Sequence, residues 1–216
     1  MQLPPNAVLF DCDGVLVDSE TITNTVMRDS LANYGLNLTL HEVMGLFVGG
    51  TIQSCYEQAK KLGAGLPDDW VQNIYGEMYE RLAEEVTPIP GAIEVLDRLD
   101  AAGVPYAVGS NGPHVKMNIT LAKTGLKDRL EGRVVSREDV AQPKPAPDIY
   151  LRAAQLMGEP VERCIVIEDS VSGVKAGKAA GMVTWGFTAE TSEEALAPIS
   201  DATFSSMAEL PALLKV

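Results

Sequence analysis

Two carboxylates separated by a single residue stand at the end of an apolar run near the start of the chain. The run Val8-Leu9-Phe10 leads directly into Asp11-Cys12-Asp13. Side chains two residues apart on an extended backbone point to the same side, so Asp11 and Asp13 would lie next to each other. Buried carboxylates repel unless a cation or a shared proton intervenes. The pair predicts metal binding or acid–base chemistry, although either aspartate alone could be a helix cap or a turn residue.

Further polar residues follow two other apolar runs. Ser110-Asn111 come after the second run and lead into a predicted helix N-terminus, where free backbone N–H groups favour an anion. Glu168-Asp169 come after a later run and form a second acidic pair. Between them, Lys144 has a proline on each side, which limits where its ammonium can go. Each of these residues alone has an ordinary explanation, but together, after separate strands, they indicate one reactive site.

These residues need a sheet that brings the strand ends together. Short apolar runs alternate with helical patterns, which is typical of a parallel sheet covered on both faces. We therefore expect an α/β fold with a doubly wound, Rossmann-like parallel sheet, whose ligands bind at the carboxyl ends of the strands. Helices are expected between Gly91 and Gly103, after Pro113 and over residues 146–157. The predicted strands are 7–10, 106–109, 133–135, 164–167, 182–185 and 202–204.

Residues 17–86 break this alternation, because helix signals accumulate there without a strand-like run. We expect an inserted α-helical cap of four helices over 17–86, within an α/β core of residues 1–16 and 87–216. The helix signals are, in order, Ser19, the capping pair Thr39 and Glu42, Thr51 before a helix that ends at Gly63, and Pro67.

Composition narrows the possible partners. The chain has 30 acidic and 17 basic residues and a net charge of −13, which argues against nucleic-acid binding. No run is long enough for a membrane span and no basic signal segment is recognisable, so we expect a cytoplasmic protein without a membrane contact. Its three cysteines, Cys12, Cys55 and Cys164, fit neither a disulfide framework nor a zinc site. A monomer is expected.

The motifs DCDGVLVDSE, SNGP, KPAPD and EDSVSG, in this order, resemble those of the haloacid-dehalogenase-like (HAD) hydrolase superfamily, in its sugar-phosphate phosphatase and β-phosphoglucomutase branch. The resemblance covers nearly the whole chain, including the insertion after the first motif. It implies that Asp11 is the nucleophile and Asp13 the general acid/base. The implied phosphate ligands are Ser110, Lys144 and, at the same turn, Asn111. The implied Mg²⁺ ligands are Asp11, the Asp13 carbonyl and Asp169, with Glu168 as a further ligand or a supporting acid.

The expected function is that of a Mg²⁺-dependent phosphatase that hydrolyses a small sugar or polyol monophosphate through an aspartyl phosphate. A phosphosugar mutase is the first alternative, but it needs cationic groups in the cap, and residues 29–59 contain no Lys or Arg. A phospho-accepting receiver domain is a more distant alternative, which lacks such an insertion.

The resemblance also implies that a cap loop closes over the leaving group. We expect Gly49, Gly50, Thr51 and Gln53 to set substrate specificity there. Residues 16–86 hold eleven acidic and four basic residues, so a second phosphate would meet an unfavourable field. A substrate carboxylate would fare little better unless Lys116 or His114 reaches it, and neutral polyhydroxy monophosphates are therefore the expected substrates.

Overall fold

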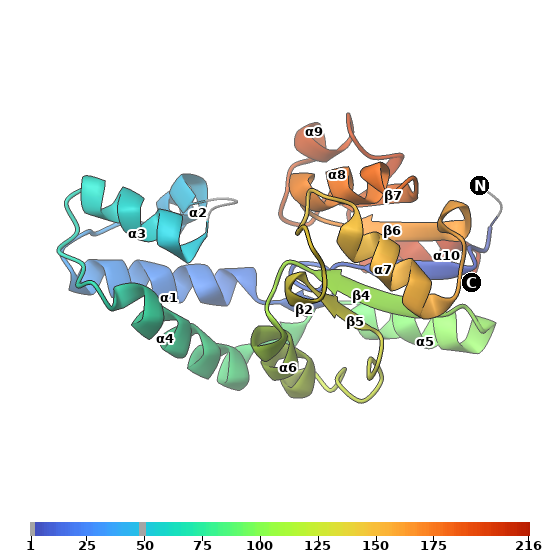
Figure 1. Cartoon of the computed structure of the whole chain (residues 1–216), viewed down its shortest axis with the longest axis horizontal. Helices are drawn as coiled ribbons and strands as arrows, with labels where there is room; N and C mark the ends of the chain where they lie inside the picture. Colours follow the sequence, from blue (N-terminus) through green and yellow to red (C-terminus); the bar gives the residue numbers. More distant parts are fainter. Residues whose placement is uncertain (1–2, 48–50) are drawn as a thin grey trace. The chain divides into compact units, whose positions relative to one another are not determined.

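The computed structural model describes residues 3–47 and 51–216 (Figure 1). It divides into two compact units, one of Met1–Asp18 with Thr87–Val216 and one of Ser19–Val86. The expected boundary lay two residues earlier, before Val17. Val17–Asp18 (β2) pairs antiparallel with Thr87–Pro88 (β3) and so stays with the first unit. Strands of two residues have no periodicity, which is why the sequence did not reveal them.

The first unit is built on six parallel strands in the order β5-β4-β1-β6-β7-β8. Every neighbouring pair in this sheet is parallel. The prediction of a doubly wound parallel sheet is thereby confirmed. The strands are β1 (Ala7–Phe10), β4 (Tyr106–Ser110), β5 (Val134–Ser136), β6 (Cys164–Glu168), β7 (Val183–Phe187) and β8 (Ala202–Phe204).

Helices cover both faces of this sheet because its strands are apolar on both sides. On one face Leu9 and Val166 pack in a fully buried cluster with Ile149 and Ala153 of α7, and α7 runs along β4 in Figure 1. On the other face Phe10 meets Tyr106 edge to face, with ring centroids 6.5 Å apart. The helices of this unit are α5 (Ala92–Ala102), α6 (His114–Lys123), α7 (Asp148–Met157), α8 (Val171–Ala179), α9 (Glu193–Leu196) and α10 (Leu210–Leu214), with 3-10 turns η1 (Arg137–Asp139), η2 (Val161–Arg163) and η3 (Met207–Glu209).

The second unit is helical, with α1 (Glu20–Asn33), α2 (Leu40–Phe47), α3 (Ile52–Lys61) and α4 (Trp70–Glu85). Trp70 is buried in its apolar core and donates a 3.0 Å hydrogen bond from Nε1 to Ser30 Oγ. The expected capping pair forms, since Thr39 N donates to Glu42 Oε2 at 2.8 Å and Glu42 N donates to Thr39 Oγ1 at 3.2 Å. None of the helices in the described ranges combines the length and apolarity that crossing a membrane would require.

Candidate active site

Three neighbouring strands bring the predicted site residues to one edge of the sheet. β1 lies between β4 and β6, with Phe10 opposite Val108 on one side and Ile167 on the other. Asp11 follows Phe10 at the end of β1, and Ser110 and Glu168 are the last residues of β4 and β6. The structure therefore joins residues that lie up to about 157 positions apart in the chain at the edge where parallel sheets bind ligands.

The loop after β1 turns back on itself within a few residues. The N–H groups of Leu16 and Val17 both donate to the Cys12 carbonyl, and Gly14 has the positive φ of 76° that favours glycine. A Cβ on Gly14 would lie 2.2 Å from Asp169 Oδ2. The Asp169 carboxylate thus packs directly against this loop, and only glycine leaves room for it.

Lys144 lies between two acidic residues of the site. Its Nζ contacts Asp11 Oδ1 and lies 2.6 Å from Glu168 Oε1, and the Lys144 side chain is only 3% exposed. The ring of Tyr150 lies under the ammonium, 4.7 Å from Nζ to the centroid. A buried ammonium is tolerated only with such partners, because desolvation of an unpaired charge is costly. The arrangement places a fixed positive charge beside Asp11.

Asn111 holds the backbone of Lys144. Asn111 Nδ2 donates to the Lys144 carbonyl at 3.2 Å, and the Lys144 N–H donates to Asn111 Oδ1 at 2.9 Å. The sequence assigned Asn111 to phosphate binding, but both ends of its side-chain amide bind Lys144. A contact of Asn111 with a phosphate would therefore come from its backbone N–H or from the second N–H of Nδ2.

The turn after β4 is fixed by two serines. Ser110 Oγ accepts a 2.9 Å hydrogen bond from the Gly112 N–H, and Ser136 Oγ donates to the Gly112 carbonyl at 2.8 Å. Ser110 is nearly fully buried, at 2% exposure. Ser136 ends β5 at the same edge and was not among the predicted site residues, although it follows the predicted strand 133–135. The two serines hold the turn in one shape.

Asp13 and Lys116 form an ion pair. Lys116 Nζ lies 2.8 Å from Asp13 Oδ1, and the two side chains are 20% and 18% exposed. His114, two residues before Lys116, directs its ring to Asp139, with Nε2 2.9 Å from the carboxylate. Both side chains that the sequence offered for a substrate carboxylate, Lys116 and His114, therefore contact aspartates.

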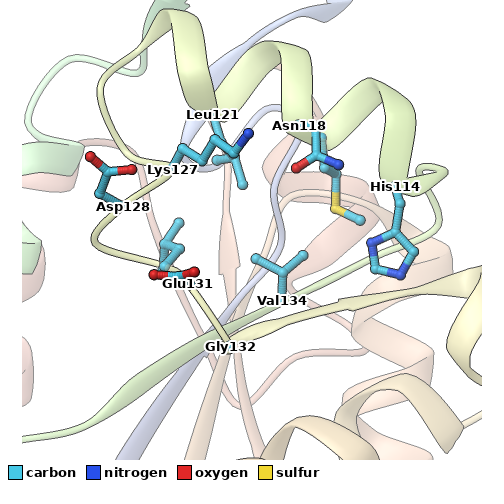
Figure 2. A pocket seen from close by; sticks show the side chains of 10 residues that line it. His114, Asn118, Leu121, Lys127, Asp128, Glu131, Gly132 and Val134 are labelled. Atoms are coloured by element: carbon cyan, nitrogen blue, oxygen red, sulfur yellow. The ribbon is translucent and has the colours of Figure 1, made fainter.

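His114 also lines a hollow of about 330 Å³ between α6, the 127–132 segment and β5. Figure 2 shows His114 and Asn118 of α6 on one side of this hollow and Val134 of β5 on the other. None of the residues predicted to act in catalysis or to bind phosphate or metal lines it, so the hollow is distinct from the site at the strand ends.

The cap residues chosen from the sequence are only partly described. Gly49 and Gly50 lie outside the described residues. Thr51 Oγ1 accepts a 3.1 Å hydrogen bond from Ser54 N and so caps α3, as expected. Gln53 is exposed, with Nε2 3.3 Å from Glu57 Oε1. Their part in specificity stays a prediction.

Comparison with protein families agrees with this arrangement. Residues 5–181 match the family model described as haloacid dehalogenase-like hydrolase. The chain belongs to the haloacid dehalogenase-like hydrolases. This assignment removes the receiver-domain alternative.

Several similar relatives of the hydrolase are named as phosphatases. It is 32% identical to the 6-phosphogluconate phosphatase of Escherichia coli (strain K12) over 97% of this chain and 94% of that protein. It is 33% identical to hexitol phosphatase A of the same organism over 80% of this chain and 78% of that protein. A crystal structure of a HAD family hydrolase from Deinococcus radiodurans R1, with bound phosphate and sodium, matches it with a TM-score of 0.85 at 36% identity, covering 99% and 97% of the two chains. The hydrolase is a phosphatase that acts on phosphoric monoesters.

Burial changes the acidity of several groups in the hydrolase. It raises the pKa of Asp11 to about 7, against the opposing effect of the Lys144 charge. Burial alone would lower the pKa of Lys144, but the charges of Asp11 and Glu168 outweigh it and hold that pKa above its usual range. Burial and the Glu168 charge raise the pKa of Tyr150 well above its usual value, so its hydroxyl stays protonated and donates to Glu168 Oε1 at 2.8 Å. Burial likewise raises the pKa of the Cys12 thiol, in keeping with an unreactive residue.

The donor set of the hydrolase suits a hard divalent cation. In the described part of the chain no three His, Cys, Asp or Glu side chains converge as a ready ligand group. Mg²⁺ does not need one, because it binds through one or two carboxylates and completes its shell with water and substrate phosphate. Asp169 packs against the loop that carries Asp11 and Asp13, and all these donors are oxygens. Asp11, Asp13, Glu168 and Asp169 thus offer only oxygen donors at this edge of the sheet, and these residues fit Mg²⁺.

Proposed function

We propose that the hydrolase is a Mg²⁺-dependent phosphatase of a sugar or polyol monophosphate and that it works through a phosphorylated Asp11. The observation that carries the proposal is the meeting of Asp11 with Lys144 at the strand ends, next to Asp13 and Asp169. The phosphatase relatives and the bound phosphate in the Deinococcus radiodurans hydrolase support it.

In the first half-reaction an Asp11 oxygen forms a bond to phosphorus while the bond from phosphorus to the leaving oxygen breaks. Lys144 and the Ser110 hydroxyl offer positive charge and a hydrogen bond to the phosphoryl oxygens, so that charge is stabilised as it shifts. Asp13 gives its proton to the leaving oxygen, which departs as an alcohol. The product of this step is an acyl phosphate on Asp11 and an ionised Asp13.

In the second half-reaction the ionised Asp13 takes a proton from a water molecule. The water oxygen forms a bond to phosphorus while the bond between phosphorus and Asp11 breaks. Inorganic phosphate leaves, Asp11 is restored as a carboxylate and Asp13 is again protonated. One residue thus serves as acid and then as base.

The residues that would hold Mg²⁺ are Asp11, Asp169 and the Asp13 carbonyl, with Glu168 as a supporting acid. When bound, the ion would supply positive charge that favours the ionised nucleophile and shields it from the anionic substrate. Glu168 is already tied in place, because its Oε2 accepts hydrogen bonds from Ser170 N at 3.1 Å and Ser170 Oγ at 2.9 Å. It would act through Lys144, whose ammonium it fixes.

The substrate class rests on the relatives and on charge. The similar phosphatases are named for a sugar-acid phosphate and for hexitol phosphates. The helical unit is acidic and has no Lys or Arg over residues 29–59. In the core, the Lys116 ammonium and the His114 ring each contact an aspartate. These charges favour a neutral monophosphate over a bisphosphate and disfavour the mutase, which must bind a sugar bisphosphate.

A screen with purified protein and Mg²⁺ tests the proposal. It measures phosphate release from hexitol phosphates, fructose 1-phosphate, 6-phosphogluconate, hexose bisphosphates and p-nitrophenyl phosphate. We expect steady release that is fastest from a monophosphate. Acid quenching with radiolabelled substrate should trap label on the wild-type protein that hydroxylamine removes, and none on Asp11→Asn. Trapped label in the variant, or a bisphosphate as the best substrate, would contradict the proposal.

A further inference from the structure

Lys116 stands where helix α6 disfavours a cation. It is the third residue of this helix, which begins at His114. The first turn of a helix carries the positive end of the helix dipole, so a lysine there is unfavourable for the helix itself. The side chain is also mostly shielded from water, at 20% exposure. The stability of α6 therefore does not explain why a lysine stands at this position. The contact that its ammonium makes has to explain it.

That contact is Asp13. Lys116 Nζ lies 2.8 Å from Asp13 Oδ1. The other carboxylate oxygen, Oδ2, lies on the side of the turn after β4, since a Cβ on Gly112 would be 3.5 Å from it and 3.2 Å from Ser110 Oγ. The two oxygens of Asp13 therefore have different surroundings. One contacts the ammonium and the other faces the turn that carries Ser110.

The pair also joins two separate elements of the site. Asp13 belongs to the loop after β1, and Lys116 belongs to the helix that follows the Ser110 turn. The turn is itself fixed by hydrogen bonds, from Gly112 N to Ser110 Oγ at 2.9 Å and from Ser136 Oγ to the Gly112 carbonyl at 2.8 Å. Lys116 thus ties the aspartate loop to a rigid neighbour. Loss of Lys116 would remove the ammonium contact that fixes Asp13 Oδ1.

We propose that Lys116 is a positioning residue that fixes the Asp13 carboxylate, with Oδ1 held by its ammonium and Oδ2 presented to the leaving oxygen. The inference rests on the proposed function, in which Asp13 protonates that oxygen. Lys116 acts through Asp13 and does not itself bind the phosphoryl group. Proton transfer depends steeply on geometry, and a misplacement of about 1 Å can cost roughly 10²-fold in rate. Loss of Lys116 should therefore slow the phosphorylation of Asp11 only with substrates whose leaving group has to be protonated.

The experiment measures single-turnover rates of Asp11 phosphorylation by acid quenching, with an alkyl phosphate and with p-nitrophenyl phosphate. For Lys116→Met we expect a loss of roughly 10²-fold on the alkyl phosphate and little change on p-nitrophenyl phosphate, whose leaving group departs without a proton. Lys116→Arg, which keeps the charge, should recover part of the alkyl rate. Lys123→Met, an exposed lysine of the same helix, is the matched control and should leave both rates unchanged.

A double-variant cycle distinguishes positioning from a general structural effect. If Lys116 acts through Asp13, adding Lys116→Met to Asp13→Asn should slow the alkyl reaction no further. Equal losses on the two substrates, or additive losses in the cycle, would overturn the inference. Lys116→Gln provides the same measurement should the methionine variant fail to fold. If Asp13→Asn itself showed no dependence on the leaving group, the proposed acid would be wrong as well. If the rate loss depended on the leaving group in Asp13→Asn but not in Lys116→Met, the positioning role of Lys116 would be wrong and the role of Asp13 as the acid would stand.

Discussion

The hydroxyl of Tyr150 donates a 2.8 Å hydrogen bond to Glu168 Oε1, the same oxygen that lies 2.6 Å from Lys144 Nζ. The phenol and the ammonium therefore share one acceptor, while the tyrosine ring packs under the ammonium. Tyr150 comes from the first turn of α7, which follows the loop that carries Lys144. It supports both the position of Lys144 and that of Glu168.

Tyr150→Phe should keep the ring and lose this hydrogen bond. We expect a loss of roughly 1.5–3 kcal/mol in the free energy of unfolding, because the acceptor is charged and buried. Phosphorylation should slow as Lys144 loses its fixed place. Urea unfolding and single-turnover kinetics measure the two effects. Tyr34→Phe, an exposed tyrosine of the helical unit, is the control. A free energy of unfolding and a phosphorylation rate equal to those of the wild type would show that this hydrogen bond contributes neither to stability nor to the position of Lys144.

Asp11→Asn should abolish turnover and leave the fold intact, since the two side chains are nearly isosteric and the amide is a poor nucleophile. Removal of a nucleophile of this kind reduces kcat by roughly 10⁴-fold or more. Phosphate release and circular dichroism report the two properties. Asp128→Asn, an exposed aspartate, is the control and should behave as wild type. Appreciable turnover by Asp11→Asn would rule out its covalent role.

Chelation should stop phosphate release, and Mg²⁺ should restore it while Ca²⁺ does not, because Ca²⁺ is larger and takes more ligands. Binding can be followed without activity. A ligand that binds only the folded state stabilises it by about 2.7 kcal/mol at a hundred times its Kd, so Mg²⁺ should raise the Tm of the protein. We expect Asp169→Asn to lose most of this rise. A rise equal to that of the wild type would show that Asp169 is not a ligand.

Gln53→Ala should raise KM for sugar phosphates with little change for p-nitrophenyl phosphate, if Gln53 contacts the hydroxyl groups of the leaving group. Gln53 is exposed and lies in the first turn of α3. Gln72→Ala, in the exposed face of α4, serves as the control. Steady-state kinetics on both substrates make the comparison. An equal change in KM for the two esters would mean that Gln53 does not recognise the sugar.

The stability of the core should depend on Asp201 at neutral pH. Burial by itself raises the pKa of Asp201, but the ion pair with Lys178 and the hydrogen bond from Thr184 N outweigh it and lower that pKa. A lowered pKa in the folded state gives stability above the unfolded pKa of about 3.9, and this stability is lost as the pH falls through the folded value. Asp201→Asn should cost at most about 1 kcal/mol at neutral pH, because the pair is partly exposed.

Urea unfolding at several pH values measures this difference. The difference in the free energy of unfolding between wild type and Asp201→Asn should become smaller as the pH falls from 7 towards 3. Asp128→Asn provides the surface control here too. A difference that stays constant or grows in acid would show that the ionised Asp201 carboxylate does not stabilise the core.

The sequence predicted the sheet closely because its strands are buried on both faces. The predicted strands 7–10 and 202–204 match β1 and β8 residue for residue, and the other four differ by one or two residues at their ends. Helix starts were less certain. The third core helix was expected from residue 146 but begins at Asp148, and α4 begins at Trp70 rather than at Pro67. In both places a turn precedes the helix, and its hydrogen bonds run from Ala146 N to Pro143 and from Trp70 N to Pro67.

The site residues could be chosen from the sequence because each follows a strand. Their partners could not, because the contacts of Asn111 with Lys144 and of Lys116 with Asp13 join elements far apart in the chain. Tyr150 carried a weak signal, as an aromatic hydroxyl in the helix after the Lys144 loop. Strand ends thus indicate which groups meet, while side-chain pairing has to be read from the structure.

The central place of β1 in the sheet has a consequence for hydrogen exchange. Its backbone is paired with β4 on one side and with β6 on the other, and the N–H of Asp11 itself donates to the Ile167 carbonyl at 3.0 Å. Amides in such a strand exchange with solvent only when the whole domain opens. The backbone that carries the nucleophile should therefore be among the last parts of the core to exchange, and partial openings of the outer strands would leave it in place.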